Sequence, residues 1–89
     1  MKINDQFILR NVAGDNLLVP TGDAAIDVKG LILLSESGAI LYDQLKKGKT
    51  KEDLVAVLTS EYEVSEEEAR QDTESFLEQM RQLHILLEE

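Results

Sequence analysis

The side chains most suited to catalysis or metal binding in this chain are one histidine and two clusters of carboxylates. His84 is the single histidine, and nothing marks a serine or a carboxylate as its partner in a catalytic triad. It follows an apolar helical stripe, so we interpret it as a helix-end residue. The clusters at 61–63 and 66–68 lack the alternating oxygen ligands and the central glycine of a calcium loop. A solvated helix start explains these clusters better, and we predict no metal site.

Other residue types that support catalysis are absent or unpatterned. The sequence has no cysteine, which excludes disulfides, thiolate metal sites and a cysteine nucleophile. Its glycines form neither a dinucleotide-binding fingerprint nor a phosphate-binding loop. Among eighteen acidic residues, some pairs must lie close together, so proximity alone does not indicate acid–base chemistry. We therefore predict that the protein is not an enzyme, has no catalytic residue and needs no cofactor.

The charge balance limits the classes of partner. Nine basic and eighteen acidic residues give a net charge of −9, which repels phosphate backbones and anionic membrane surfaces. We therefore expect neither a nucleic acid nor a membrane as partner. The run Lys46-Lys47-Gly48-Lys49, with Lys51 after it, is interpreted as a solvated turn or a docking spot for an acidic partner. No apolar segment resembles a membrane span or a signal peptide, so we expect a cytoplasmic protein.

Eighty-nine residues allow one modest core, so we assign residues 1–89 to a single domain. Phe7 to Val12 is typical of a strand. The residues 13–16 supply turn formers, and Leu17 to Val19 predicts a second strand that ends at Pro20. Together these segments predict a β-hairpin.

The next segment, Ala24 to Leu34, is expected to be extended. Ile26 and Val28 alternate with polar residues, which predicts a half-buried first part, and Lys29-Gly30 is interpreted as a bulge or bend. The run Leu31 to Leu34 is aliphatic on both faces and is too short for an isolated helix, so it predicts a strand in the middle of the fold.

Helical spacing follows in three segments. The first helix is predicted from about Glu36 to Lys46, with Ser35 as N-cap and Gly48 as the left-handed residue that ends it. Thr50 with Asp53 predicts the start of the second helix. We expect Tyr42, on the apolar stripe of the first helix, to be a core ring whose hydroxyl reaches the surface.

The third helix is predicted to begin at Ser65 with Glu68 as a full capping box, and to run to about Gln82. The apolar tail 85–87 must be buried, and we predict a short strand there. The fold class is therefore α+β, specifically a winged helix-turn-helix with an N-terminal three-stranded antiparallel sheet packed on a three-helix bundle.

The segment from Leu34 to Leu45, LSESGAILYDQL, resembles the Leu-Asn-x-Thr-Ala-x-x-Ile-Trp-x-x-Leu segment of the PqqD family, the pyrroloquinoline-quinone biosynthesis D proteins and related peptide-recognition elements. The similarity extends over about Arg10 to Leu87. It continues through Gly48-Lys49-Thr50, Asp53-Leu54, Leu58, Tyr62, Val64, Asp72 and Phe76-Leu77. The chain departs from the family pattern at Ser35 (usually Asn), Tyr42 (usually Trp), Thr73 (usually aliphatic) and His84 (commonly Gly).

This resemblance implies a non-enzymatic peptide chaperone or adaptor. Such domains bind the leader of a ribosomally made precursor peptide as an added strand and present it to a modifying enzyme, in the quinone pathway a radical S-adenosylmethionine enzyme. The resemblance implies peptide binding by the strand residues Val28, Lys29, Gly30, Leu31, Ile32 and Leu33. On the third helix it implies Asp72, Ser75, Phe76 and Gln79, with Met80 deeper.

Two alternatives remain open from the sequence. A winged-helix DNA-binding or transcriptional module would need cations on its second or third helix, whereas the third helix is rich in glutamate. An acidic oligomerisation domain, such as a homodimer, would use the apolar tail 85–87. The sequence does not name the precursor peptide, the modifying enzyme or the final product.

Overall fold

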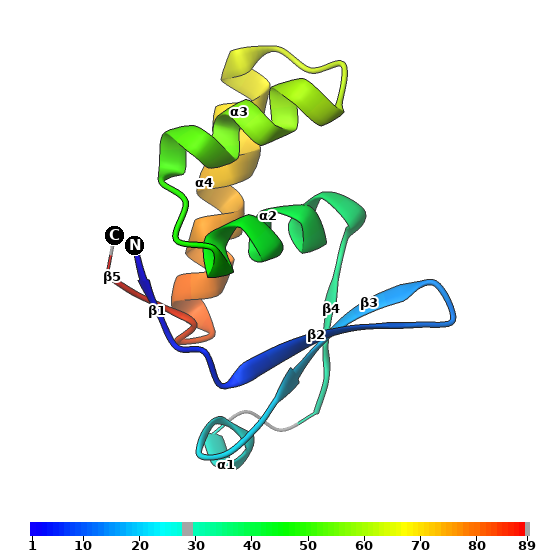
Figure 1. The fold of residues 1–89 in the computed structure, drawn as a ribbon, viewed down its shortest axis with the longest axis vertical. Coiled ribbons are helices and arrows are strands. Elements are labelled where there is room, and N and C mark those ends of the chain that lie inside the picture. The colour runs from blue at the N-terminus through cyan, green and yellow to red at the C-terminus, as the bar shows by residue number, and fades with distance from the viewer. Residues whose placement is uncertain (28–29, 89) are drawn as a thin grey trace.

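The computed structural model describes residues 1–27 and 30–88. It places the long helices on one side of a three-stranded antiparallel sheet (Figure 1), which confirms the predicted α+β winged helix-turn-helix. The sheet has the order β2-β3-β4. Its strands are β2 (Phe7–Val12), β3 (Asp15–Pro20) and β4 (Ile32–Leu34). The long helices are α2 (Glu36–Lys46), α3 (Lys51–Glu61) and α4 (Glu66–Gln82).

The predicted hairpin is confirmed, with a shorter turn than expected. Ala13 and Gly14 both have positive φ, 52° and 87°, which is the backbone of a two-residue turn that matches the twist of paired strands. Val12 therefore lies opposite Asp15, and the register continues to Phe7 opposite Pro20. Because so tight a turn suffices, Asp15 and Asn16 belong to β3 rather than to the connection.

The segment after the hairpin is not extended as expected. Ala24–Asp27 form a short helix, α1, because the preceding turn directs its backbone into helical bonds: Ala24 N–H donates to Thr21 O at 3.1 Å. Ala24 N–H also donates to the side-chain oxygen of Gln6 at 3.1 Å. Ile26 is consequently 72% exposed, and the expectation of a half-buried residue was wrong. The predictions for Val28 and Lys29 lie outside the described residues.

The predicted helix starts are confirmed by hydrogen bonds at each N-cap. Ser35 Oγ accepts from Gly38 N–H at 3.1 Å at the start of α2. Thr50 and Asp53 exchange both bonds of a capping box at the start of α3. At the start of α4, Ser65 Oγ accepts from the backbone N–H of Glu68 at 3.1 Å. The reciprocal bond from the Ser65 N–H to the Glu68 carboxylate is absent, so the prediction of a full capping box was wrong in this half.

Tyr42 joins the helical layer to the sheet. Its side chain is fully buried, and its hydroxyl donates to the backbone oxygen of Phe7 at 2.9 Å. The expectation that this hydroxyl reaches the surface was therefore wrong, because the β2 backbone covers it. Burial of the phenol, with a smaller contribution from the charge of Asp5, raises the pKa of Tyr42 to about 12.

A second, two-stranded sheet brings the ends of the chain together. β1 (Lys2–Ile3) pairs antiparallel with β5 (Leu86–Glu88), so both termini lie side by side in Figure 1. Ile85 and Leu86 are buried within this same chain, which confirms the predicted C-terminal strand. The sequence did not reveal β1 as its partner. Burial of Ile85 and Leu86 weakens the case for oligomerisation through the tail, of which Leu87 is left 51% exposed.

The C-terminal end of α4 offers a test of backbone strain. His84 has a φ of 59°, while Ile85 N–H donates to Met80 O at 2.8 Å and His84 N–H to Arg81 O at 3.1 Å. This is the helix end at which glycine is preferred. His84→Gly should therefore stabilise the domain by about 0.5–1 kcal/mol, because it removes left-handed strain from a residue with a Cβ.

Urea unfolding would measure this gain, with Gly48→Ala as the matched control. Gly48 has a φ of 81° and open space around its Cα, so alanine there adds strain without a clash. It should destabilise the domain by about 1 kcal/mol. If both variants lowered the stability, His84 would have to contribute more through its side chain than it costs in strain.

Candidate functional site

The predicted strand Leu31 to Leu34 lies at an open edge of the three-stranded sheet. Within the described residues, β4 pairs only with β3. Its side chains alternate, since Leu34 is 4% exposed whereas Leu31 and Leu33 are 60% and 64% exposed. Ile32 is half-buried and Gly30 is an exposed bend with a φ of 95°. The strand thus buries one apolar face and leaves the other accessible.

The register shows which backbone groups of β4 face outward. In an antiparallel ladder, residues that exchange bonds with their partner alternate with residues whose N–H and C=O point the other way. A two-residue turn closes on a bonded pair, here Val12 with Asp15, so Leu17 points toward β2 and Leu18 toward β4. Leu18 is opposite Ile32. Ile32 therefore bonds to β3, and the N–H and C=O of Leu33 face the open edge. Because the orientation alternates along a strand, the N–H and C=O of Leu31 face the same edge.

The four predicted residues of α4 come together in one hollow. Its volume is about 280 Å³, and it lies between the start of α2 and the middle of α4. Buried Leu41 and Phe76 form an apolar floor, while polar side chains form the walls. The lining residues are Ser35, Ser37, Gly38, Leu41, Asp72, Ser75, Phe76 and Gln79. Because Ser35 directly follows β4, this hollow begins where the open strand ends.

A neighbouring hollow was not predicted from the sequence. It has a volume of about 310 Å³ and shares Ser35, Ser37 and Asp72 with the first. Its remaining lining residues are Glu36, Leu58, Tyr62 and Val64. Burial raises the pKa of the Tyr62 hydroxyl above its ordinary value, and the charges of Glu36 and Glu61 raise it further. The sequence offered one signal for this hollow, the apolar pair Tyr62 and Val64 between two predicted helices. Spacing alone assigns this pair to the core, so the hollow was not predicted.

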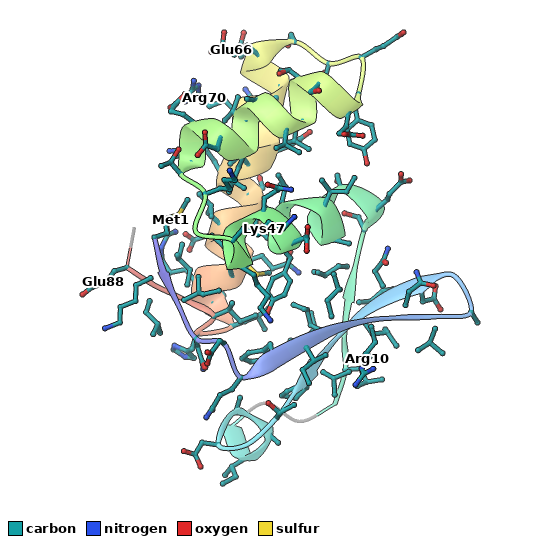
Figure 2. All side chains as sticks on the ribbon, viewed as in Figure 1. Met1, Arg10, Lys47, Glu66, Arg70 and Glu88 are labelled. Atoms are coloured by element: carbon teal, nitrogen blue, oxygen red, sulfur yellow. The ribbon has the colours of Figure 1, made fainter. Side chains whose placement is uncertain are left out.

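The charges on α4 are unlike those of a DNA-recognition helix. Arg70 donates to both oxygens of Glu52, at 2.7 and 2.9 Å, and to Glu66 at 3.3 Å; Figure 2 shows Arg70 and Glu66 at one end of the helix. These bonds lower the pKa of Glu52 and raise that of Arg70. Arg81 is likewise paired with Glu78. Both cations of the helix are therefore neutralised, and nothing favours nucleic-acid binding.

The described part of the chain lacks two further kinds of feature. There, no group of three or more histidine, cysteine, aspartate or glutamate side chains is arranged to hold a metal ion. The helices in that part also include none long and apolar enough to cross a membrane.

Fold and site together define a winged helix-turn-helix domain with an open strand edge beside a helical groove. The family model for Coenzyme PQQ synthesis protein D (PqqD) matches residues 20–86. The chain therefore belongs to the PqqD family. No curated protein matches the sequence closely.

Two solved structures share this fold. One is TbiB1 in complex with the TbiA(beta) leader peptide, with a TM-score of 0.77 and 22% identity over 97% of this chain and 94% of that one. The other is lasso peptide synthetase B1 complexed with the leader peptide, with a TM-score of 0.77 and 18% identity over 98% of this chain and 96% of that one. At these identities the likeness concerns the fold.

Proposed function

We propose that this domain is a non-enzymatic adaptor that binds the leader of a ribosomally made precursor peptide. The leader adds an extended strand to the edge of β4 and rests against α4. The observation that carries the proposal is the outward-facing backbone of Leu33, in line with a hollow that contains Asp72, Ser75, Phe76 and Gln79. The two solved structures described above are complexes with leader peptides, which supports the same occupant here.

Strand addition divides the recognition of the leader between backbone and side chains. Backbone bonds to Leu31 and Leu33 would supply affinity that depends little on sequence, and pockets would supply specificity. Because side chains alternate along a strand, every second residue of the leader would face α4 and its hollow. The residues Val28, Lys29, Gly30 and Ile32 complete the proposed strand contact. An apolar floor with polar walls favours an apolar leader side chain flanked by polar ones.

The proposed partner in turnover is a separate peptide-modifying enzyme. Membership of the PqqD family makes a radical S-adenosylmethionine enzyme the first candidate, in quinone biosynthesis or a related peptide pathway. The domain would hold the leader while that enzyme acts on the remainder of the peptide. Since ribosomal precursors and such enzymes meet inside the cell, we place this function in the cytoplasm. The domain itself would supply no catalytic group.

Amide NMR gives a direct test of the proposed site. Titration with the leader of a candidate precursor peptide should shift the amides of residues 31–33 and of Asp72, Ser75, Phe76 and Gln79, because both groups line the proposed site. The amides of Lys47, Gly48 and Lys49, on the turn after α2, should stay in place. A scrambled leader of the same composition is the control. Unmoved strand amides at saturating leader would contradict the proposal for that peptide.

A further inference from the structure

The outer face of the three-stranded sheet is apolar and is not covered by the long helices. The helical layer packs on the opposite face, where Phe7, Leu18 and Leu34 are buried. On the outer face, Ile8 is 39% exposed and Val12 is 55% exposed, next to the exposed Leu31 and Leu33. Figure 1 shows α2, α3 and α4 on one side of the sheet only. Four exposed large apolar side chains on one face of a small sheet are typical of a contact surface.

The register arranges this face in rows across the strands. Ile8 lies opposite Val19; Arg10 lies opposite Leu17, which lies opposite Leu33. The last row is Val12 opposite Asp15. Arg10 and Asp15 are the charged residues of these rows, and they stand one row apart on neighbouring strands. Figure 2 shows Arg10 on the side of the hairpin that faces away from α2.

The distribution of charge directs association toward this face. Residues 35–89 contain fourteen acidic and six basic side chains, whereas residues 1–34 contain four and three. Two copies that meet through their helical layers would therefore repel each other strongly, while the sheet halves are close to neutral. Arg10 has no ion-pair partner within the described residues of its own chain, unlike Arg70. It remains available for a carboxylate on another molecule.

We propose that two copies of this chain pack through the outer faces of their sheets. In a two-fold dimer the same patch serves on both sides, so each contact occurs twice. An axis that passes between Arg10 and Asp15 places Arg10 of each copy beside Asp15 of the other. The apolar side chains of the rows then meet across the interface, with the ion pairs as the elements that set the register. The outer face thus carries both a positive and a negative side chain, Arg10 and Asp15, and is complementary in charge to a second copy of itself.

This dimer leaves the proposed peptide sites accessible. The open edge of β4 lies at the side of the sheet, and the hollow at Asp72 and Phe76 lies on the helical side. Contact between outer faces covers neither the hollow nor the backbone edge of β4, whereas the side chains of Leu31 and Leu33 lie in the interface. One dimer would therefore present two strand edges and two hollows to peptides. The inference does not depend on peptide binding, and its test needs the protein alone.

Sedimentation velocity over a range of protein concentrations tests the dimer. The wild type should show a reversible monomer–dimer equilibrium. Arg10→Glu and Asp15→Lys should each raise the dimer Kd about tenfold or more, because each places like charges together at a partly desolvated contact. The double variant Arg10→Glu/Asp15→Lys should return to within a few-fold of the wild type. Val19→Lys should abolish the dimer.

The charge variants also separate specific pairing from general repulsion. Asp15→Lys reduces the net negative charge of the chain, so general repulsion predicts a tighter dimer and the proposed pairing predicts a weaker one. Circular dichroism should show that all variants remain folded. A chain that stays monomeric at millimolar concentration overturns the proposal, as does a double variant that fails to recover.

Discussion

Leu33→Pro is expected to abolish or strongly weaken leader-peptide binding while the domain remains folded. The register directs the N–H of Leu33 toward the open edge of β4 and not toward β3. Proline removes that donor without removing a bond from the native sheet, and proline is tolerated on edge strands where the N–H faces solvent. One net hydrogen bond contributes about 0.5–1.5 kcal/mol, and the ring also obstructs the incoming strand. We therefore expect the Kd to rise at least about tenfold.

Two controls isolate the backbone effect. Leu33→Thr alters the same exposed side chain but retains the N–H, so it should change the affinity much less than proline does. Ile32→Pro removes a donor that faces β3, so it should lower the stability of the domain itself. Isothermal titration with the cognate leader and urea unfolding would measure the two properties separately. Equal binding losses in the threonine and proline variants would show that the side chain, rather than the strand edge, holds the peptide.

The helical part of this fold was accessible from the sequence because local signals determine it. Ser35, Thr50 and Ser65 cap their helices through side-chain bonds to residues three positions away, which spacing can reveal. The hairpin was accessible for the same reason. The short helix α1 was not, because the side chain of Gln6, eighteen residues away, receives one of its first N–H groups. The alternation of Ile26 and Val28 with polar residues resembled a strand, and in residues 24–27 a distant partner overrode it.

The candidate site was partly accessible. The resemblance to a family supplied the strand residues Val28 to Leu33 and four α4 residues, and the structure places these four, Asp72, Ser75, Phe76 and Gln79, in one hollow. Sequence reasoning missed Ser35 and Ser37, which line both hollows. The sequence explains Ser35 fully as the N-cap of α2. Nothing further in the sequence indicates that the same residue also lines a groove. The sequence also could not show which backbone groups of β4 face outward. Their direction depends on the register of the hairpin, and this register is defined only by the pairing of the strands.

The second large effect is expected for Tyr42→Phe, which should destabilise the domain by about 1–3 kcal/mol near neutral pH. The substitution keeps the buried ring but removes the hydroxyl that donates to Phe7 O. That carbonyl belongs to Phe7 of β2, which is buried together with Tyr42, and an unsatisfied buried acceptor costs about this much. Urea unfolding of both proteins at pH 7 would measure the difference.

The same pair of proteins predicts a characteristic dependence on pH. Burial raises the pKa of Tyr42 from 10.0 to about 12 in the folded state. Below pH 10 the phenol is protonated in both states, so its contribution is fully present. Between pH 10 and 12 the unfolded chain releases this proton and the folded chain retains it, so the stability of the wild type falls as pH rises. Phenylalanine has no such proton, and all other groups titrate alike in both proteins.

The difference in unfolding free energy between wild type and Tyr42→Phe should therefore narrow by about 1.4 kcal/mol between pH 9 and pH 11. A gap that stays constant over this range would mean that the hydroxyl ionises as readily in the folded protein as in the unfolded chain, and that its bond to β2 is not protected from water.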